Sequence, residues 1–501
     1  MEINEILRPH QQQSVETLLQ IFQHHTSAVD ASDMGTGKTF VACAIAHRLQ
    51  VPTLVIAPKI ALTNWRQTIQ HFNDSLSIIN YEQLCTGRTN FGTWENQGSL
   101  QSGRRKFEFV CQFCLRRFTD GQTVEMCPFQ AKGCHCFDTR RIPVRRGQFN
   151  FHPAIKFAIF DEAHRTGGTD SLNAEILLAC KRQGIPHLLM SATLADSPLK
   201  MRAIGFSLDL HNDKTDVVYP VNKPNFFRWC SRRGVRRDPR FHGLKWFAGE
   251  KEKQSIMAEI NEAIFPARGV RVSTADIPGF PEQQILAELY DIEESSQIEK
   301  IYAEMRDALG VLDEKKSTDS DSKAVEILRA RQRIGLLKVP LATELATDSL
   351  DAGRSVVLFC NFHQEIDELA NRLSCPSIDG RTKDRDREKI IASFQRNDTR
   401  CLAVQSDAVG ITISLQDRDG QHPRIGYVFP PWSATTFTQL TGRFRREGGK
   451  SASVFKVMLA AGTIEEKVHR VLRSKIMCGQ SLNDGDFQPD FLMLRSRETL
   501  K

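Results

Sequence analysis

The segment from Ser32 to Thr39, with the sequence S-D-M-G-T-G-K-T, constrains the fold of this chain more than any other. It lies between a short apolar run at residues 28–31 and a run from Phe40 to Leu49 that suits a helix. Its two glycines let the backbone bend so that consecutive N–H groups point at one anion. The lysine and threonine that follow can reach the β- and γ-phosphates of a nucleotide and bind Mg²⁺. The expected phosphate-binding residues are Gly35, Thr36, Gly37, Lys38 and Thr39, with Thr39 also a Mg²⁺ ligand.

Short apolar runs alternate with helix-length amphipathic segments over the first 200 residues. This alternation predicts an α/β fold with a doubly wound parallel sheet, in which ligands bind beyond the carboxyl ends of the strands. Asp161 and Glu162 directly follow one such run, at residues 157–160. A carboxylate there can hold Mg²⁺ through water, and a second one can activate the attacking water. We therefore expect Asp161 to be a Mg²⁺ ligand and Glu162 to be the general base.

The second half of the chain contains another set of apolar runs but no second phosphate loop. Its most informative segment runs from Gln439 to Arg446 and has the pattern Q-x-x-G-R-x-x-R. From a second lobe, Arg443 and Arg446 could reach across a cleft and stabilise the charge that develops on the γ-phosphate in the transition state. A basic, solvated helix face is the alternative interpretation of this segment taken alone.

Together these motifs resemble those of the superfamily 2 helicases and translocases, and most closely the Swi/Snf-type DNA translocases, which contain a DEAH box. Further segments that resemble family motifs are Leu7–Gln11, Asn64-Trp65, Ile378–Thr382, Ala408–Thr412 and Gly462–Val468. The resemblance implies two RecA-like lobes with doubly wound parallel sheets, and ATP and Mg²⁺ in the cleft between them. It also implies that Gly410 and Gln439 belong to the nucleotide site. Gln11 could read adenine, because its amide both donates and accepts hydrogen bonds.

The resemblance implies an ATP hydrolase that couples hydrolysis to movement along double-stranded or branched DNA, which it remodels, unwinds or anneals. Two alternatives are an ATP-dependent RNA helicase and a non-motor, zinc-containing adaptor that binds nucleic acid. The Swi/Snf-type motifs argue against the first, and the complete set of catalytic residues argues against the second. The chain departs from the family pattern at Ser32, where a glycine is usual, at Thr36, where a leucine is usual, and at Arg381, where a serine is usual. None of these substitutions removes a catalytic group.

Five of the 13 cysteines lie close together, between residues 111 and 136. A C-x-x-C pair followed by further cysteines has the spacing of a structural Zn²⁺ site. The segment has few aliphatic residues, and zinc could supply on the order of 10 kcal/mol of folding free energy. The expected ligands are Cys111, Cys114 and Cys127, with either Cys134 or Cys136 as the fourth.

The formal net charge of +7 is unevenly distributed along the 501 residues. Residues 101–149 carry ten basic and four acidic side chains. Such an excess predicts contacts with a nucleic-acid backbone, because Lys and Arg gain free energy by releasing condensed counterions. DNA is the expected partner. The polar N-terminus is unlike a signal peptide, and no apolar run approaches the roughly 18 residues of a membrane helix. We therefore expect a soluble, cytoplasmic protein of bacterial or viral origin, with no membrane partner.

The positions of the motifs divide the chain into five expected parts. They are a first lobe at residues 1–200, a basic zinc-binding insert within it at 100–148, a helical insertion region at 201–330, a second lobe at 331–480 and a C-terminal tail at 481–501.

Overall fold

The structure is a computed structural model of the chain. It describes residues 3–72, 76–95, 107–111, 117–119, 139–143, 148–169, 171–212, 225–238, 244–314, 320–406, 413–430, 433–446, 448–463, 465–484 and 494–496. Among these residues, no helix combines the length and apolarity needed to cross a membrane.

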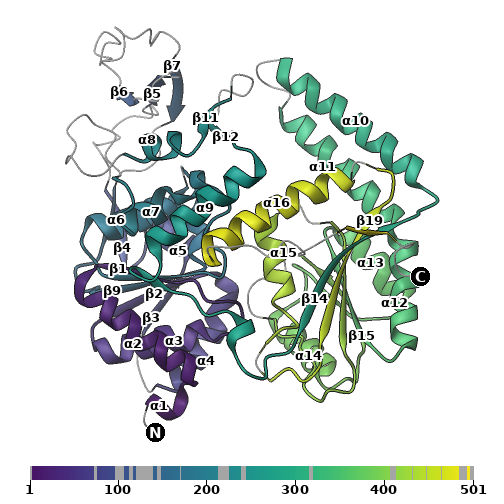
Figure 1. Cartoon of the computed structure of the whole chain (residues 1–501), viewed down its shortest axis with the longest axis horizontal. Helices are drawn as coiled ribbons and strands as arrows, with labels where there is room; N and C mark the ends of the chain where they lie inside the picture. Colours follow the sequence, from purple (N-terminus) through teal and green to yellow (C-terminus); the bar gives the residue numbers. More distant parts are fainter. Residues whose placement is uncertain are drawn as a thin grey trace.

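The first lobe is built on a six-stranded sheet in which every pairing is parallel (Figure 1). In spatial order its strands are β13 (Gly269–Val270), β1 (Ser27–Asp30), β10 (His187–Met190), β9 (Phe157–Asp161), β2 (Thr53–Ala57) and β3 (Ser77–Asn80). Successive side chains of a strand point to opposite faces, so Leu54 and Ile56 enter one hydrophobic core and Val55 the other. The expected doubly wound parallel sheet is therefore confirmed.

Helices cover both faces of this sheet and contribute to the two cores. One core contains residues of α2 (Pro9–His24), α3 (Lys38–Leu49) and α4 (Leu62–Gln70). The other contains residues of α5 (Tyr81–Thr86), α6 (Leu172–Arg182), α7 (Arg202–Ser207), α8 (Phe226–Ser231) and α9 (Glu250–Ile264).

The second lobe has its own parallel sheet, of seven strands. Their spatial order is β16 (Ser377–Ile378), β17 (Cys401–Gln405), β15 (Ser355–Cys360), β18 (Arg424–Val428), β19 (Ser453–Ala460), β14 (Gln283–Tyr290) and β20 (Leu494–Ser496). Helices α12 (Val339–Asp351) and α13 (His363–Arg372) contribute to one core, and α14 (Asp384–Gln395), α15 (Ala434–Thr441) and α16 (Glu465–Asp484) to the other. Two parallel-sheet lobes of this kind match a RecA-like helicase fold.

The two sheets place the lobe boundaries differently from the expectation. Strand β13 belongs to the first sheet and β14 to the second, although both lie within the expected helical insertion region at 201–330. The expected tail at 481–501 likewise contains the end of α16 and the edge strand β20. Strands of two or three residues carry too little pattern to be recognised in a sequence, and this explains why β13 and β20 were missed. The insertion region does contain helices, among them α10 (Ser295–Glu314), which packs on α11 (Ser320–Leu337).

Short antiparallel strands lie within the insert of the first lobe and on either side of it. Strands β4 (Gly92–Trp94) and β8 (Phe149–Phe151) pair with each other, and β5 (Phe107–Cys111) pairs with both β6 (Arg117–Thr119) and β7 (Thr139–Pro143). Cys111 ends β5, whereas Cys114, Cys127, Cys134 and Cys136 lie outside the described residues. No group of three or more His, Cys, Asp or Glu side chains in the described part could hold a metal. The zinc site therefore stays a prediction.

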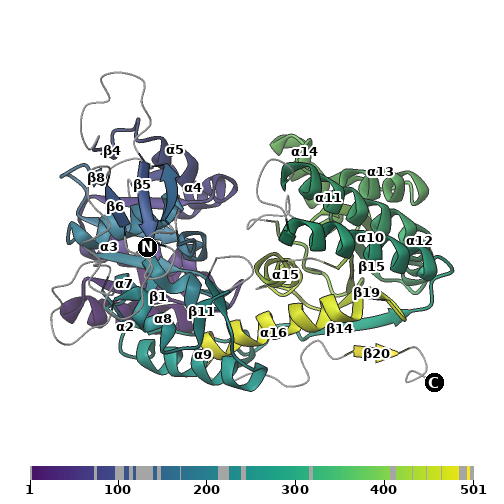
Figure 2. The ribbon, with the colours of Figure 1, turned by 90° about the horizontal axis from the view of Figure 1, so that it is seen from above.

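Helix α16 connects the two lobes (Figure 2). It begins after β19 in the second lobe and packs along α9 of the first. Its residues Cys478 and Leu482 are part of the hydrophobic core of the first lobe, while Leu472 and Ile476 are part of a core of the second.

Candidate active site

The phosphate loop, residues 32–39, turns sharply between β1 and α3. Gly35 and Gly37 both have a φ of +84°, a conformation that side chains with a Cβ rarely adopt. A Cβ on Gly37 would also lie 2.1 Å from Nε2 of Gln11, so any other residue there would displace the amide of Gln11. Because α3 begins at Lys38, the unpaired N–H groups of its first turn are available to an anion.

Lys38 and Gln11 both contact the backbone of this loop. The ammonium group of Lys38 donates to the carbonyl oxygens of Ser32 and Asp33, at 2.7 and 2.9 Å. Burial lowers the pKa of Lys38, and the charges of Asp30 and Glu162 oppose that shift. The amide of Gln11 accepts from the N–H of Arg8 and donates to the carbonyl of Thr36, each at 3.0 Å. Gln11 thus holds the loop at Thr36, whereas Lys38 holds it at Ser32 and Asp33.

Asp161 lies at the carboxyl end of β9, where the sequence predicted a metal-binding carboxylate. Its Oδ2 accepts a hydrogen bond of 2.8 Å from the indole N–H of Trp65, and its backbone carbonyl accepts one of 2.8 Å from the hydroxyl of Tyr81. Burial and the neighbouring charge of Glu162 raise the pKa of Asp161 to about 6, and the Trp65 hydrogen bond opposes this shift. Thr39 and Asp161 line the same cavity, so together they could hold Mg²⁺.

Glu162 has a φ of +51° and a ψ of +52°, in the left-handed region. For a residue with a Cβ this conformation costs about 1–2 kcal/mol, and such outliers cluster at active sites. Its carboxylate lies 3.1 Å from Nδ1 of His164, which also lies 3.1 Å from the hydroxyl of Ser191. Burial opposes ionisation of Glu162, but the hydrogen bond with His164 and the charges of Lys38 and Arg443 lower its pKa overall. A general base needs this ionised state.

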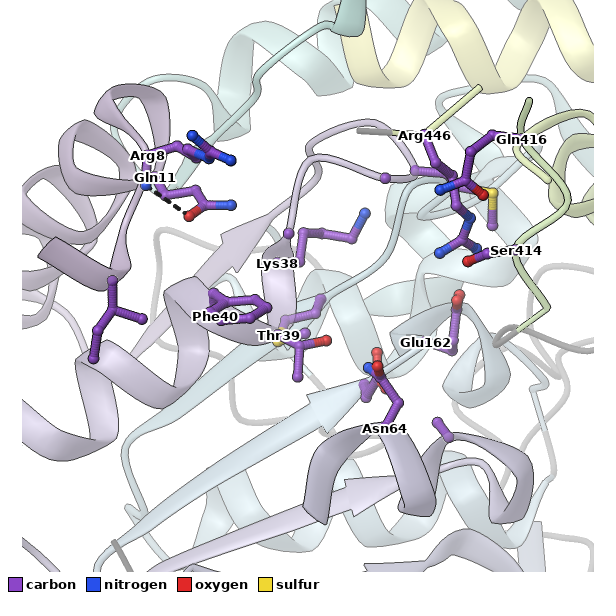
Figure 3. Close-up of a pocket in the computed structure, with 17 residues that line it drawn as sticks. Arg8, Gln11, Lys38, Thr39, Phe40, Asn64, Glu162, Ser414, Gln416 and Arg446 are labelled. Atoms are coloured by element: carbon purple, nitrogen blue, oxygen red, sulfur yellow. Dashed lines mark hydrogen bonds between the residues drawn. The ribbon is translucent and has the colours of Figure 1, made fainter. Parts of the chain in front are cut away.

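A cavity of about 410 Å³ lies between the lobes at the phosphate loop (Figure 3). Of the predicted site residues, Gln11, Gly35, Gly37, Lys38, Thr39, Asp161, Glu162 and Arg446 line it. Arg443 and Gln439 are not part of the lining, Thr36 is buried outside it, and Gly410 lies outside the described residues. Sequence reasoning did not identify Arg8, Phe40, Asn64, Ser414 and Gln416 as lining residues.

The arginines of the second lobe lie against the phosphate loop. A Cβ on Gly35 would be 3.1 Å from the carbonyl oxygen of Arg445, and one on Gly442 would be 2.5 Å from Sδ of Met34. Arg443 is fully buried, and none of its guanidinium nitrogens has a hydrogen-bond partner among the described residues. Burial and the charge of Arg446 lower the pKa of Arg443 to about 9, and the charge of Glu162 opposes this. The guanidinium therefore stays charged at neutral pH.

The donor set fits a nucleotide with Mg²⁺. Glycines at positive φ, the start of α3 and Lys38 offer donors to phosphates, and Thr39 and Asp161 offer oxygen ligands to the metal. A buried, unpartnered guanidinium such as that of Arg443 is costly without an anion, and a phosphate group would compensate it.

Two family models match the chain, one in each lobe. Residues 4–196 match the family described as type III restriction enzyme, res subunit, and residues 338–448 match the helicase conserved C-terminal domain. The chain is a superfamily 2 helicase-type protein that resembles the Swi/Snf-type translocases. It is accordingly an ATP-hydrolysing enzyme.

Relatives of this superfamily 2 protein are similar over most of its length. A protein of Acanthamoeba polyphaga mimivirus, whose name assigns it to the ATP-dependent RNA helicases, is 26% identical over 96% of this chain and 84% of its own length. The SWI/SNF-related matrix-associated actin-dependent regulator of chromatin subfamily A-like protein 1 of Xenopus tropicalis is 22% identical over 91% of this chain and 43% of its own length. A structure of S. cerevisiae Dbp5 bound to RNA and ADP BeF3 has a TM-score of 0.44 and 11% identity, and covers 96% of this chain and 89% of that chain.

Proposed function

We propose that the protein is an ATP-dependent translocase that moves along double-stranded or branched DNA, which it remodels, unwinds or anneals. The environment of Arg443 is the observation that supports the motor function. The guanidinium of this second-lobe residue is buried within electrostatic range of the first-lobe Glu162 and has no hydrogen-bond partner among the described residues. Such a group stabilises the developing charge of phosphoryl transfer only when the two lobes are together, which links hydrolysis to lobe movement.

Each site residue has a role in this proposal. Lys38 and the backbone of the phosphate loop bind the β- and γ-phosphates, and Gln11 recognises the adenine. Thr39 and Asp161 hold Mg²⁺, which supplies charge neutralisation on the phosphates. Glu162 orients and deprotonates the attacking water. Arg443 and Arg446 stabilise the transition state from the second lobe.

DNA is proposed as the track on the basis of the Swi/Snf-type motifs and the likeness to the Xenopus protein over 91% of the chain. The mimivirus relative, named as an ATP-dependent RNA helicase, favours RNA as the second candidate. ATP hydrolysis measured with single-stranded, duplex and forked DNA, and with duplex RNA of the same sequence, distinguishes the two. We expect duplex or forked DNA to stimulate most strongly, and stimulation by RNA alone would contradict DNA as the track.

Strand-separation and annealing assays on the same substrates identify what the movement accomplishes. Glu162→Gln is the control variant, because it should bind ATP but not hydrolyse it. If this variant kept full strand-separating or annealing activity, the motor function would be wrong and the adaptor alternative would be favoured.

We further propose that the insert binds one Zn²⁺ through Cys111, Cys114 and Cys127 with Cys134 or Cys136. Metal analysis of the purified protein should give about one zinc per chain. Cys111→Ser combined with Cys114→Ser should abolish binding, whereas the buried Cys43→Ser should not. A wild-type protein purified without zinc, at full activity, would contradict this site.

The basic side chains of the insert are proposed to contact the DNA backbone. A variant with Arg140, Arg141, Arg145 and Arg146 replaced by alanine should keep its zinc but show a shallower dependence of log affinity on log salt concentration, because fewer counterions are released. An unchanged slope would exclude these arginines from the interface.

A further inference from the structure

The segment that leaves the first lobe runs alongside the phosphate loop. The N–H of Ala31 donates to Val270 at 3.0 Å, and the N–H of Asp33 donates to Val272 at 2.9 Å. The hydroxyl of Ser32 accepts from the N–H of Val272 at 3.1 Å. Ser32 stands where the family pattern has glycine, and its hydroxyl thus attaches the loop to the segment that leads to the second lobe.

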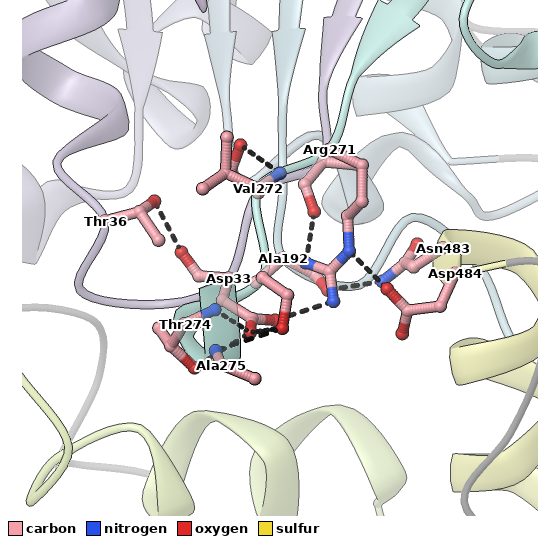
Figure 4. A network of polar contacts seen from close by, with 12 residues as sticks. Asp33, Thr36, Ala192, Arg271, Val272, Thr274, Ala275, Asn483 and Asp484 are labelled. Atoms are coloured by element: carbon pink, nitrogen blue, oxygen red, sulfur yellow. Dashed lines mark hydrogen bonds and ion pairs between the residues drawn. The ribbon is translucent and has the colours of Figure 1, made fainter. Parts of the chain in front are cut away.

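Arg271 lies in this segment and contacts three groups at once (Figure 4). Its guanidinium pairs with Asp33 at 2.7 Å, donates to the carbonyl of Ala31 at 2.7 Å and pairs with Asp484 at 2.6 Å. Asp33 belongs to the phosphate loop, and Asp484 is the last residue of α16. A single side chain therefore joins the nucleotide site to the helix that connects the lobes.

Asp33 can transmit the position of Arg271 to the site. Its carboxylate also accepts from the N–H and hydroxyl of Thr274, at 2.8 and 3.0 Å. Burial would raise its pKa, but the charge and hydrogen bond of Arg271 and the Thr274 contacts lower it overall. Its backbone carbonyl accepts from Lys38 at 2.9 Å and from the hydroxyl of Thr36 at 2.9 Å. A shift of Asp33 would consequently shift the phosphate-binding lysine.

Helix α16 is anchored at both ends. In the second lobe, its first residue Glu465 pairs with Lys338, and both side chains are buried. In the first lobe, Asn483 donates at 2.6 Å to the carbonyl of Ala192, the second residue after β10. Its 20 residues span about 30 Å at 1.5 Å per residue. Because hydrogen bonds make the helix stiff, movement of the second lobe reaches Asp484 rather than being absorbed between the lobes.

We propose that Arg271 is a positioning residue for ATP hydrolysis, which holds the phosphate loop through Asp33 and makes its geometry depend on α16 through Asp484. The part that concerns α16 rests on the proposed function, because it requires nucleic acid to change the lobe arrangement. The part that concerns Asp33 requires only nucleotide binding.

Arg271→Gln tests the contact with the loop. We expect nucleotide affinity, measured with a fluorescent ATP analogue, to fall about tenfold or more and KM for ATP to rise, because small misplacements of binding groups are costly. Arg271→Lys should restore part of the affinity. The matched control is Arg268→Gln. Arg268 is 17% exposed compared with 16% for Arg271, and it pairs with Asp209 instead of the loop. This control should leave nucleotide affinity unchanged even if it lowers the melting temperature.

Asp484→Asn tests the contact with α16. This variant keeps the pair between Arg271 and Asp33, so hydrolysis without nucleic acid should be unchanged. Stimulation by duplex DNA should fall about fivefold or more, as expected for loss of a coupling between sites. Equal loss of basal and stimulated rates would overturn the coupling.

The two parts of the proposal fail separately. Unchanged nucleotide affinity and KM in a folded Arg271→Gln variant would overturn the positioning role and leave a structural one. If no nucleic acid stimulates the wild-type enzyme, the proposed function and the coupling through α16 both fail, whereas the affinity measurement still decides the role of Arg271.

Discussion

The indole N–H of Trp65 donates a hydrogen bond of 2.8 Å to the carboxylate of Asp161, and both side chains are buried. Trp65 lies on α4 and Asp161 at the end of β9, so the contact crosses between two elements of the first lobe. It fixes one oxygen of the carboxylate that is expected to hold Mg²⁺. Through this contact, a tryptophan in a hydrophobic core would orient the proposed Mg²⁺ site.

Trp65→Phe should weaken activation by Mg²⁺ by about tenfold or more. Phenylalanine keeps most of the packing but lacks the N–H, and a hydrogen bond to a charged group contributes about 1.5–3 kcal/mol. ATPase rates measured across Mg²⁺ concentrations report this change. Tyr81→Phe is the matched control, because it removes a buried hydrogen bond to the backbone of Asp161 and leaves the carboxylate contact intact. Equal Mg²⁺ dependence in both variants would contradict the role of the indole.

ATP hydrolysis should decline as the pH falls through about 6, because Asp161, with a pKa of about 6, becomes protonated and loses affinity for Mg²⁺. A higher Mg²⁺ concentration should move the decline to lower pH, and Trp65→Phe should move it to higher pH. The stability of the folded protein should depend on pH in the opposite direction, as far as Asp161 is concerned. The unfolded chain loses the same proton near its ordinary pKa of 3.8, so protonation of Asp161 favours the folded state at low pH, and this contribution disappears as the pH rises to about 6. Profiles of kcat/KM and melting temperature against pH measure the two effects.

Arg443→Met should lower kcat about a thousandfold with little change in KM, as loss of an arginine finger does. The same variant should melt at a higher temperature, because it removes a buried charge that has no hydrogen-bond partner among the described residues. Arg424→Met is the control. Arg424 is equally buried but hydrogen-bonds to Asn397 and to the carbonyl of Phe394, so its loss should destabilise the protein. A lower melting temperature for Arg443→Met would indicate a structural role.

Glu465→Gln should destabilise the second lobe by about 3–5 kcal/mol, because it leaves the buried ammonium of Lys338 without its counter-charge. Chemical denaturation followed by far-ultraviolet circular dichroism measures the loss in unfolding free energy. The comparison is Glu368→Gln, which breaks the pair with Arg372, in which both side chains are 44% exposed. That change should cost no more than about 1 kcal/mol. If the two variants lost similar amounts of unfolding free energy, the buried pair would stabilise the protein no more than the exposed pair.

The sequence predicted those parts of the site that follow a strand or fill a short motif. Lys38, Asp161 and Glu162 were found because each adjoins a recognisable strand or loop, and the structure brings them to one cavity. Arg271 could not be found in this way, because it follows a two-residue strand and lies more than 200 positions from its partner Asp33. The sequence places Trp65 only in a segment that resembles a family motif, because the packing of α4 on the sheet is needed to reveal where its N–H points.

The division of the chain into lobes was harder to predict than the site. The apolar residues of strand β14 are interrupted by Glu288 and preceded by Gln283 and Gln284, so they form no single apolar run, and the place of this strand in the second sheet depends on pairing with β19, at residues 453–460. Pairing over such a distance in sequence leaves no local signal.

The presence of Cys478 and Leu482 in the core of the first lobe has a consequence for how the protein is made. Domains commonly fold as units while the chain emerges from the ribosome, starting from the N-terminus. Here the first lobe cannot complete its core until α16 has been synthesised, after the main strands of the second lobe. Until then, the apolar face of α9 that packs against α16 in the complete structure lacks this partner. The lobe that is synthesised first therefore completes its folding only after the second lobe has been synthesised.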